Sequence, residues 1–356
     1  MQDDLFGADA PPPSTTPAAQ SVRKSRGVQA VVPSEALLAL AQAMPPQLRM
    51  GVSTWSYPGW DGLVWDGAYD PSVLSRKGLT ALSQHPLMRT VCVDRSFWRP
   101  LSVEQYAQMA AQVPEDFRFV VKCPNVVTDA LVRGEDGKGQ QRNPVFLDAG
   151  LAVQQFVEPA LQGLGSKLGV LVYQLSPLPW DMLSHTAPLY DLLASLLQAT
   201  REALTQAPEQ APDVIVAVEV RDPLLLEEAL VQVLKQHGAT LCLGLHGKMP
   251  PIEQQLPMLR RLWPTPLVCR WNLNTAFGPF GYPVAQEKHQ PFHEIRTPDP
   301  HTLAVLARTV KGITGAGQSA FVTISNDAEG CAPRSIQRLA EHLQALSMQA
   351  IQTPSR

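Results

Sequence analysis

The fold is decided by the segment Val214-Ile-Val-Ala-Val-Glu-Val-Arg221, which Asp222-Pro223 follows. Its six apolar residues are mostly β-branched, which is typical of a strand buried on both faces of a parallel sheet. Residues two positions apart in a strand point to the same side, so Glu219 and Arg221 share a face near the carboxyl end of this strand. Burying a charged pair costs free energy unless the charges are paired or meet a ligand. We therefore expect a polar site here, and a helix over residues 224–237 behind it.

Apolar runs alternate with helical patterns on both sides of this segment. The expected strands are residues 50–53, 89–93, 117–122, 169–175, 214–220, 240–245, 267–270 and 320–325. The expected helices are residues 34–44, 103–113, 146–163, 190–204, 224–237, 252–262, 302–310 and 335–346. Eight strands with intervening helices predict an α/β protein with a (β/α)₈ barrel of the TIM type. An open doubly wound sheet is the alternative, but the GxGxxG turn that it would use for a dinucleotide is absent.

The composition is that of a globular protein, with 356 residues, 45% hydrophobic and 17% charged, and a net charge of −3. This charge provides no global basic field for nucleic acid. The five cysteines are odd in number and show no CxxC spacing, which favours a reducing compartment over a disulfide frame or a zinc site. No apolar run is long enough for a membrane span, and the acidic start Met1-Gln-Asp-Asp does not resemble a secretory signal. We therefore expect a cytoplasmic protein with no membrane partner.

We divide the chain into residues 1–46 and residues 47–350. The first part is rich in proline and alanine and predicts a disordered tail. Within it, Ser34 is the expected N-cap of a short helix that stops at Pro45-Pro46. The second part predicts a single barrel domain.

The tail begins with a candidate docking peptide. Gln2-Asp-Asp-Leu5-Phe6 resembles the peptide by which bacterial replication and repair proteins dock on the DNA-polymerase sliding clamp. In that interpretation Leu5 and Phe6 enter an apolar pocket and Gln2 adds hydrogen bonds, while the tether lets the barrel reach DNA. The alternative is an acidic start with an incidental Leu-Phe pair.

The carboxyl ends of the strands carry the candidate site, because TIM-type barrels place their chemistry there. Three cations at these ends, Lys122, Arg221 and Arg270, indicate a site for a phosphate or a carboxylate. Their alternative role is to pair with nearby carboxylates in a structural network at the rim, where Glu219, Asp94 and Asp327 are the candidate partners. We take Glu219 and Lys122 as the candidate catalytic residues, although Arg221 should lower the pKa of Glu219 and so favours a base or an orienting role.

Polar and aromatic residues at the same ends are candidates for binding the substrate. They are Arg221, Arg270, Gln174, Asn326, Asp94, Trp55, Tyr57 and Trp98. The aromatic residues predict a stacking wall for a sugar or a base, or else a hydrophobic cover over the barrel. Gln174 and Asn326 contact the ligand or cap nearby loops. We predict no metal site, because Pro291 interrupts the spacing of His289 and His293, although carboxylate-bound Mg²⁺ leaves little spacing signature.

Several motifs resemble one known family. Gly51-Val-Ser-Thr-Trp-Ser-Tyr-Pro-Gly-Trp60 is similar to the opening signature of the YecE-like family, domain-of-unknown-function family 72. Further likenesses follow in chain order at Phe97-Trp-Arg-Pro100, Phe117-Arg-Phe-Val-Val-Lys122, Leu168-Gly-Val-Leu-Val-Tyr-Gln-Leu175, Val218-Glu-Val-Arg221, Arg270 and Ser325-Asn326. The resemblance covers about residues 49–345. It implies a TIM-type barrel but no known reaction, because the family carries a placeholder name.

The chain departs from this family at three strand ends. Cys92 and Asp94 stand where the family's second strand carries Glu and Asn, and Asp129 replaces a histidine after the third strand. Trp271-Asn272 replaces His-Gly after the seventh strand. A carboxylate and two histidines are thus missing from the family pattern.

Three functional hypotheses follow. The first is an enzyme acting at the barrel mouth on a small anionic or polyol-like substrate, with hydrolase, isomerase and lyase chemistry left open. The second is a DNA-maintenance factor that is recruited to the sliding clamp through Gln2–Phe6 and acts on a nucleotide or nucleic acid. The third is a non-catalytic binding module, which is favoured if the missing family residues are the catalytic ones.

Overall fold

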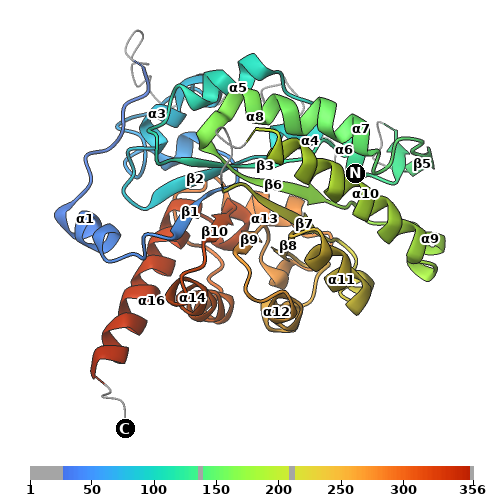
Figure 1. Ribbon diagram of the computed structural model, residues 1–356. Coiled ribbons are helices and arrows are strands. Elements are labelled where there is room, and N and C mark those ends of the chain that lie inside the picture. The colour runs from blue at the N-terminus through green and yellow to red at the C-terminus, as the bar shows by residue number, and fades with distance from the viewer. Residues whose placement is uncertain (1–26, 135–138, 208–212, 353–356) are drawn as a thin grey trace.

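The computed structural model describes residues 27–134, 139–207 and 213–352 (Figure 1). Eight parallel strands close a barrel in the order β1-β10-β9-β8-β7-β6-β3-β2, which confirms the predicted TIM-type architecture. The barrel strands are β1 Leu48–Val52, β2 Met88–Val93, β3 Arg118–Lys122, β6 Leu168–Gln174, β7 Ile215–Glu219, β8 Thr240–Leu245, β9 Leu267–Trp271 and β10 Ala320–Ile324. Each lies within about two residues of an expected strand, because a buried parallel strand reads as a continuous β-branched run.

Helices surround the barrel (Figure 1). The α-helices are α1 Glu35–Gln42, α2 Pro71–Lys77, α3 Leu79–Leu82, α4 Arg95–Trp98, α5 Val103–Ala110, α6 Asn125–Thr128, α7 Ala149–Ala152, α8 Glu158–Leu164, α9 Trp180–Ser184, α10 Ala187–Thr205, α11 Glu228–Gln236, α12 Ile252–Arg261, α13 Tyr282–His289, α14 Pro300–Gly315, α15 Asn326–Glu329 and α16 Ala332–Gln352. A π-helical stretch, Val153–Val157, joins α7 to α8. Short 3₁₀ turns occur at Pro58–Trp60, Gly165–Lys167, Pro223–Leu225 and Thr275–Phe277. No helix in the described part of the chain is long and apolar enough to cross a membrane.

The observed elements differ from the expected ones in several places, among them the following three. The helix expected over residues 224–237 begins only at Glu228, because Pro223–Leu225 forms a 3₁₀ turn and Leu226 leaves the helical conformation with a ψ of 63°. The helix expected from residue 146 begins at Ala149, where the Asp148 carboxylate accepts a hydrogen bond from the Leu151 N–H and caps it. An antiparallel hairpin of β4 Leu131–Arg133 and β5 Gly139–Arg142, which the sequence analysis did not predict, follows β3.

The strands separate two apolar layers. Inward-facing side chains fill the barrel, and they are Cys92, Val120, Val170, Val172, Ala217, Cys242, Val268 and Phe321. Outward-facing residues such as Val216, Val218 and Trp271 pack against the helices in the larger core. Glu219 is two residues beyond Ala217, so it faces inward as the period of a strand predicts. All five cysteines are free and buried.

The barrel closes tightly where β1 meets β2. A Cβ atom added at Gly51 would lie 1.8 Å from the carbonyl oxygen of Thr90. The pairing register between these strands also shifts between Met50 and Gly51. Glycine is therefore required at position 51 by the close approach of the two backbones.

Residues 27–46, which we assigned to the tail, pack against the barrel domain in the structure. Val28 is buried, Ala30 pairs with Trp65, and Ser34 caps α1 as expected by accepting a hydrogen bond from the Leu37 N–H. The expected disorder of residues 1–26 concerns a segment outside the described residues. The predicted disordered tail therefore stays a prediction for residues 1–26.

Candidate functional site

The mouth of the barrel contains a network of buried ion pairs centred on Glu219. Its Oε1 atom lies 2.5 Å from Nη2 of Arg221, and its Oε2 atom lies 2.6 Å from Nη1 of Arg270. Glu219 is fully buried, and Asn272 donates a longer hydrogen bond of 3.4 Å to Oε1. β7 and β9 thus bring Glu219 and Arg270 together across the barrel, as the strand-end prediction required.

Asp94, directly after β2, extends this network to Lys122. Its Oδ1 atom accepts a hydrogen bond of 2.8 Å from Nη2 of Arg270 and lies 3.6 Å from Nζ of Lys122. The Sγ atom of Cys92 also donates to Oδ1, at 3.2 Å. The Lys122 ammonium lies over the ring of Phe97, 4.0 Å from its centroid, so it sits between an anion and an aromatic face.

Gln174 ties the two arginines to each other. Its Oε1 atom accepts hydrogen bonds from Nη2 of Arg221 at 2.8 Å and from Nη1 of Arg270 at 3.1 Å. The structure therefore brings together Lys122, Gln174, Arg221, Arg270, Glu219 and Asp94, all of which the sequence analysis named. These groups comprise three cations and two carboxylates, which leaves one positive charge.

The network gives its two candidate catalytic residues, Glu219 and Lys122, pKa values on opposite sides of neutral pH. Burial raises the pKa of Glu219, but Arg221, Arg270 and Lys122 outweigh burial and lower this pKa to about 2. Burial lowers the pKa of Lys122 to about 8, although Asp94 acts in the opposite direction. Glu219 is therefore ionised at neutral pH, whereas Lys122 titrates close to neutrality.

A second group of polar residues lies where β1 meets β10, and we call it the seam. It consists of Ser53 and Trp55 after β1 and of Asn326 and Asp327 after β10. The backbone N–H of Ser53 donates to the carbonyl of Ile324, which fixes the two strand ends side by side. All four side chains are more than nine-tenths buried. Four of their polar atoms, Ser53 Oγ, Trp55 Nε1, Asn326 Nδ2 and Asp327 Oδ1, have no hydrogen-bond partner among the described residues.

Asp327 is the acidic residue of the seam, and its pKa is far from the usual value of an aspartate. Burial raises its pKa to about 7, against the opposing influence of hydrogen bonds with Ser325 and Gln286. Its strand-end position was noted from the sequence only as a candidate ion-pair partner. Its burial beneath α13 comes from the fold, so the sequence carried no signal of its titration near neutral pH.

The structure divides the aromatic residues that we expected to form one wall. Trp55 is buried under the guanidinium of Arg95, whose Cζ atom lies 4.7 Å from the centroid of its ring. Tyr57 is partly buried, and its pKa is raised by burial and by nearby Asp327. Trp98 is 42% exposed and packs edge-on against Phe97, so it lies at the rim rather than in the network.

The three departures from the family pattern have structural roles here. Cys92 donates to Asp94, as described above. Asp129 pairs with Arg133 and accepts a hydrogen bond from the Leu131 N–H, which holds the β4–β5 hairpin. Trp271 faces outward from β9. Asn272 was not among the predicted site residues, although it follows Arg270 by two positions and the period of a strand places both on the same face.

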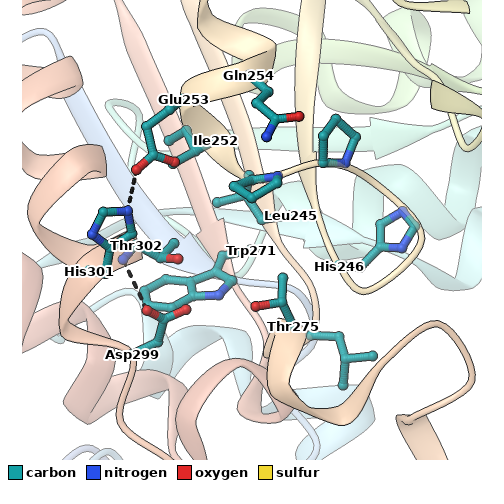
Figure 2. Close-up of a pocket in the computed structure, with 13 residues that line it drawn as sticks. Leu245, His246, Ile252, Glu253, Gln254, Trp271, Thr275, Asp299, His301 and Thr302 are labelled. Atoms are coloured by element: carbon teal, nitrogen blue, oxygen red, sulfur yellow. Dashed lines mark hydrogen bonds and ion pairs between the residues drawn. The ribbon is translucent and has the colours of Figure 1, made fainter. Parts of the chain in front are cut away.

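A cavity of about 340 Å³ lies beside the mouth, outside the barrel wall. Figure 2 shows Trp271 across its middle, with Thr275 and Asp299 near the ring and the Glu253–His301 ion pair at one side. His246 also lines it, and burial lowers the pKa of His246 to about 2. The network residues do not line this cavity, so we place the candidate site at the mouth, where the charges converge.

Two further predictions concern the sliding-clamp peptide and metal ligands. Gln2, Leu5 and Phe6 lie outside the described residues, so the sliding-clamp peptide stays a prediction. Within residues 27–134, 139–207 and 213–352, no group of three or more His, Cys, Asp or Glu side chains is placed to hold a metal ion.

Comparisons with known proteins agree with the fold. A family model described as "Protein of unknown function DUF72" matches residues 49–356. A DUF72 family protein (EF0366) from Enterococcus faecalis V583 is similar in structure, with a TM-score of 0.55, 16% identity, and coverage of 83% of this chain and 95% of the other. A DUF72 family protein (TM1631) from Thermotoga maritima MSB8 has a TM-score of 0.51, 18% identity, and coverage of 84% and 99%. At these identities the structural likeness shows the fold alone. No curated protein matches the chain.

Proposed function

The chain belongs to the DUF72 family of proteins of unknown function, and from this starting point we propose that it is an enzyme that binds a small oxyanion at the barrel mouth. The substrate would carry a carboxylate or a phosphate group. The surplus positive charge of the network is the observation that carries this proposal. Lys122, Arg221 and Arg270 each contact one or both of two carboxylates, so the network keeps one net positive charge that an anionic ligand would neutralise.

Arg221 is the residue that would contact the anion first. Its side chain is 12% exposed, whereas that of Arg270 is 2% exposed and held between Glu219 and Asp94. The Nε atom of Arg221 is buried and has no partner in the described part of the chain. A guanidinium with an unused N–H can donate to a carboxylate or phosphate oxygen without breaking its ion pair.

The proposed roles of Glu219 and Lys122 follow from their titration. A carboxylate with a pKa of about 2 is too weak a base for proton transfer near pH 7, so Glu219 would position Arg221 and Arg270. Lys122 has a pKa of about 8 and exchanges a proton far more readily. We assign proton transfer at the cationic side of the mouth to Lys122.

The test compares ligand binding by the wild-type protein with binding by Arg221→Lys. Lysine keeps the positive charge but removes the Nε–H and the planar fork. Isothermal calorimetry with inorganic phosphate, propionate, glycerol phosphate and glycerate should detect binding in the wild type and a loss of about tenfold or more in the variant.

Arg261→Lys is the matched control, because Arg261 is 55% exposed and pairs with Glu228 away from the mouth. It should bind the same anions as the wild type does. Absence of binding by every anion would refute the proposal. Binding without turnover of any bound compound would instead support a non-catalytic binding module.

A further inference from the structure

We propose that the seam is the second, uncharged half of the same site, that it binds hydroxyl or carbonyl oxygens carried by the anionic substrate, and that Asp327 exchanges a proton with one of them. This inference rests on the proposed function, because it assumes that the anion binds at the network. It names the substrate class as polyol or keto compounds with a carboxylate or phosphate at one end.

The seam offers hydrogen bonds that the described residues do not use. Trp55 Nε1 carries a hydrogen that can only be donated, and Ser53 Oγ can donate or accept. Leaving such groups buried without partners costs free energy. Four of them lie on two adjacent strand ends, where oxygen atoms of a ligand would supply the missing partners.

The orientation of Asn326 is determined by its other contacts. Its Oδ1 atom accepts hydrogen bonds from Trp60 Nε1 at 3.2 Å and from the Ala332 N–H at 2.8 Å. Two donors at one end of the amide identify that end as the oxygen. The Nδ2 group therefore lies at the other end and supplies two N–H donors to the seam.

The seam borders the cationic network on both sides. β10 pairs with β9, where Thr323 lies opposite Arg270, and β1 pairs with β2, which leads to Asp94. Burial, Asp327 and Asp94 raise the pKa of Tyr57. The seam therefore adjoins the strand ends that carry Arg270 and Asp94, and Gln174 links Arg270 to Arg221.

Asp327 is poised to transfer a proton. Its Oδ2 atom accepts a hydrogen bond from Ser325 at 3.4 Å, and its Oδ1 atom is unpartnered. In the protonated form the carboxyl O–H bond breaks, the proton forms a new O–H bond with a substrate oxygen that gains negative charge, and Asp327 is left as a carboxylate. Solvent returns the proton afterwards, so no oxidant or reductant is needed.

Few other groups near Asp327 titrate close to neutral pH. Burial raises the pKa values of Tyr57 and Tyr282. Burial, Lys288 and Arg296 lower the pKa of His289, on α13, to about 4. Glu329, on α15, is paired with Arg338. Lys122, on the cationic side of the mouth, has a pKa of about 8. A change of affinity near pH 7 that disappears when Asp327 alone is replaced would therefore identify Asp327, provided that the probe itself does not titrate there.

The experiment compares glycerate with propionate, which share a carboxylate and differ in their hydroxyl groups. Calorimetry on the full chain should show glycerate binding about tenfold tighter than propionate. Trp55→Phe should remove most of this advantage and leave propionate binding unchanged, because it deletes one N–H donor and keeps an aromatic ring at this position. Trp263→Phe, at a 47% exposed tryptophan after α12, is the matched control and should retain the advantage.

The pH dependence tests Asp327 separately. The affinity for glycerate should change around pH 7 in the wild type and in Asp116→Asn, an exposed control. In Asp327→Asn this change should be absent, and only the loss of affinity near pH 8 from deprotonation of Lys122 should remain. Equal affinities for glycerate and propionate in the wild type would overturn the seam while leaving the anion site intact. Unaltered preference in Trp55→Phe together with an unaltered pH profile in Asp327→Asn would also overturn it. Failure of both acids and of phosphate to bind would refute the anion site itself.

Discussion

Glu219 shows how a residue chosen for one chemical role can acquire another from its neighbours. A buried carboxylate alone would have a raised pKa and act as an acid. Here two guanidinium groups contact its two oxygens, and the pKa falls instead. The distance of each contact and the absence of exposed surface make this residue a positioning group.

Replacing Glu219 with Gln should destabilise the protein strongly. The change leaves two buried guanidinium groups without their carboxylate, which costs about 3–5 kcal/mol. Urea unfolding of both proteins measures the loss. Glu228→Gln, at an exposed pair with Arg261, should cost no more than about 1 kcal/mol. Similar losses in the two variants would contradict the central place of Glu219.

Glu219 also predicts acid sensitivity. Its folded-state pKa is lowered from 4.5 to about 2, so its ion pairs stabilise the fold above pH 4.5. This stability, on the order of 3 kcal/mol, is lost as the pH falls towards 2. Melting temperatures between pH 5 and pH 2.5 should therefore fall more steeply for the wild type than for Glu219→Gln. Parallel curves would show that Glu219 has no lowered pKa.

Asp327 predicts a pH dependence of folding stability with the opposite sign, because its pKa is raised and not lowered. Its folded-state pKa is raised from 3.8 to about 7, so between these values the folded chain holds a proton that the unfolded chain has lost. Stability therefore falls as the pH rises from 4 to 7, by an amount on the order of 4 kcal/mol. Asp327→Asn should remove this decline and be the more stable protein at pH 8. Thermal unfolding at pH 5 and pH 8 measures this, and an unchanged pH dependence would contradict it.

At the scale of elements, the barrel depends on how closely adjacent strands approach. Gly51→Ala would force a methyl group against the Thr90 carbonyl, and we expect a loss of about 3 kcal/mol or more, because backbone cannot move aside as a side chain can. Gly67→Ala is the matched control, since no atom lies within 4 Å of its added Cβ. Its stability should stay within about 0.5 kcal/mol of the wild type. Chemical denaturation measures the free energy of unfolding of both variants. Equal values would show that the two strands can move apart to accept the methyl group.

The sequence predicted elements better than it predicted contacts. Each buried strand is recognisable from a local run of β-branched residues, and eight such runs predict the barrel. The β4–β5 hairpin was missed because Gly139-Gln-Gln-Arg142 is exposed and carries no apolar alternation. The helix behind β7 was started too early because a 3₁₀ turn and an α-helix share the same local pattern.

The sequence identified the residues of the network and, as one alternative, Glu219 and Asp94 as ion-pair partners of its cations, but not which cation contacts which carboxylate. Strand ends identified Lys122, Glu219 and Arg270 because a parallel barrel gathers those ends at one face. The contact between Asp94 and Arg270 spans 176 residues, so no local pattern reveals it. The pKa of Asp327 likewise depends on burial by distant segments. Long-range geometry, rather than residue type, decided which acids titrate near pH 7.

At the scale of the whole molecule, residues 27–33 belong to the packed structure. Val28 is 2% exposed, and the Val31 N–H donates to the carbonyl of Val64. A chain that starts at residue 34 should therefore melt several degrees below one that starts at residue 27, because it exposes Val28 and loses this pairing. Calorimetry compares the two truncated proteins directly. Equal melting temperatures would show that residues 27–33 contribute no stability.

The closure of the barrel by its first and last strands has a consequence for biosynthesis. Ser53 and Trp55 leave the ribosome about 270 residues before Asn326 and Asp327, which corresponds to tens of seconds at about 5–20 residues per second. Until β10 emerges, the nascent chain has only one side of the seam. A ligand that needs both sides can therefore stabilise only the finished polypeptide, and a ribosome that stalls before β10 would leave a chain that the ligand cannot rescue.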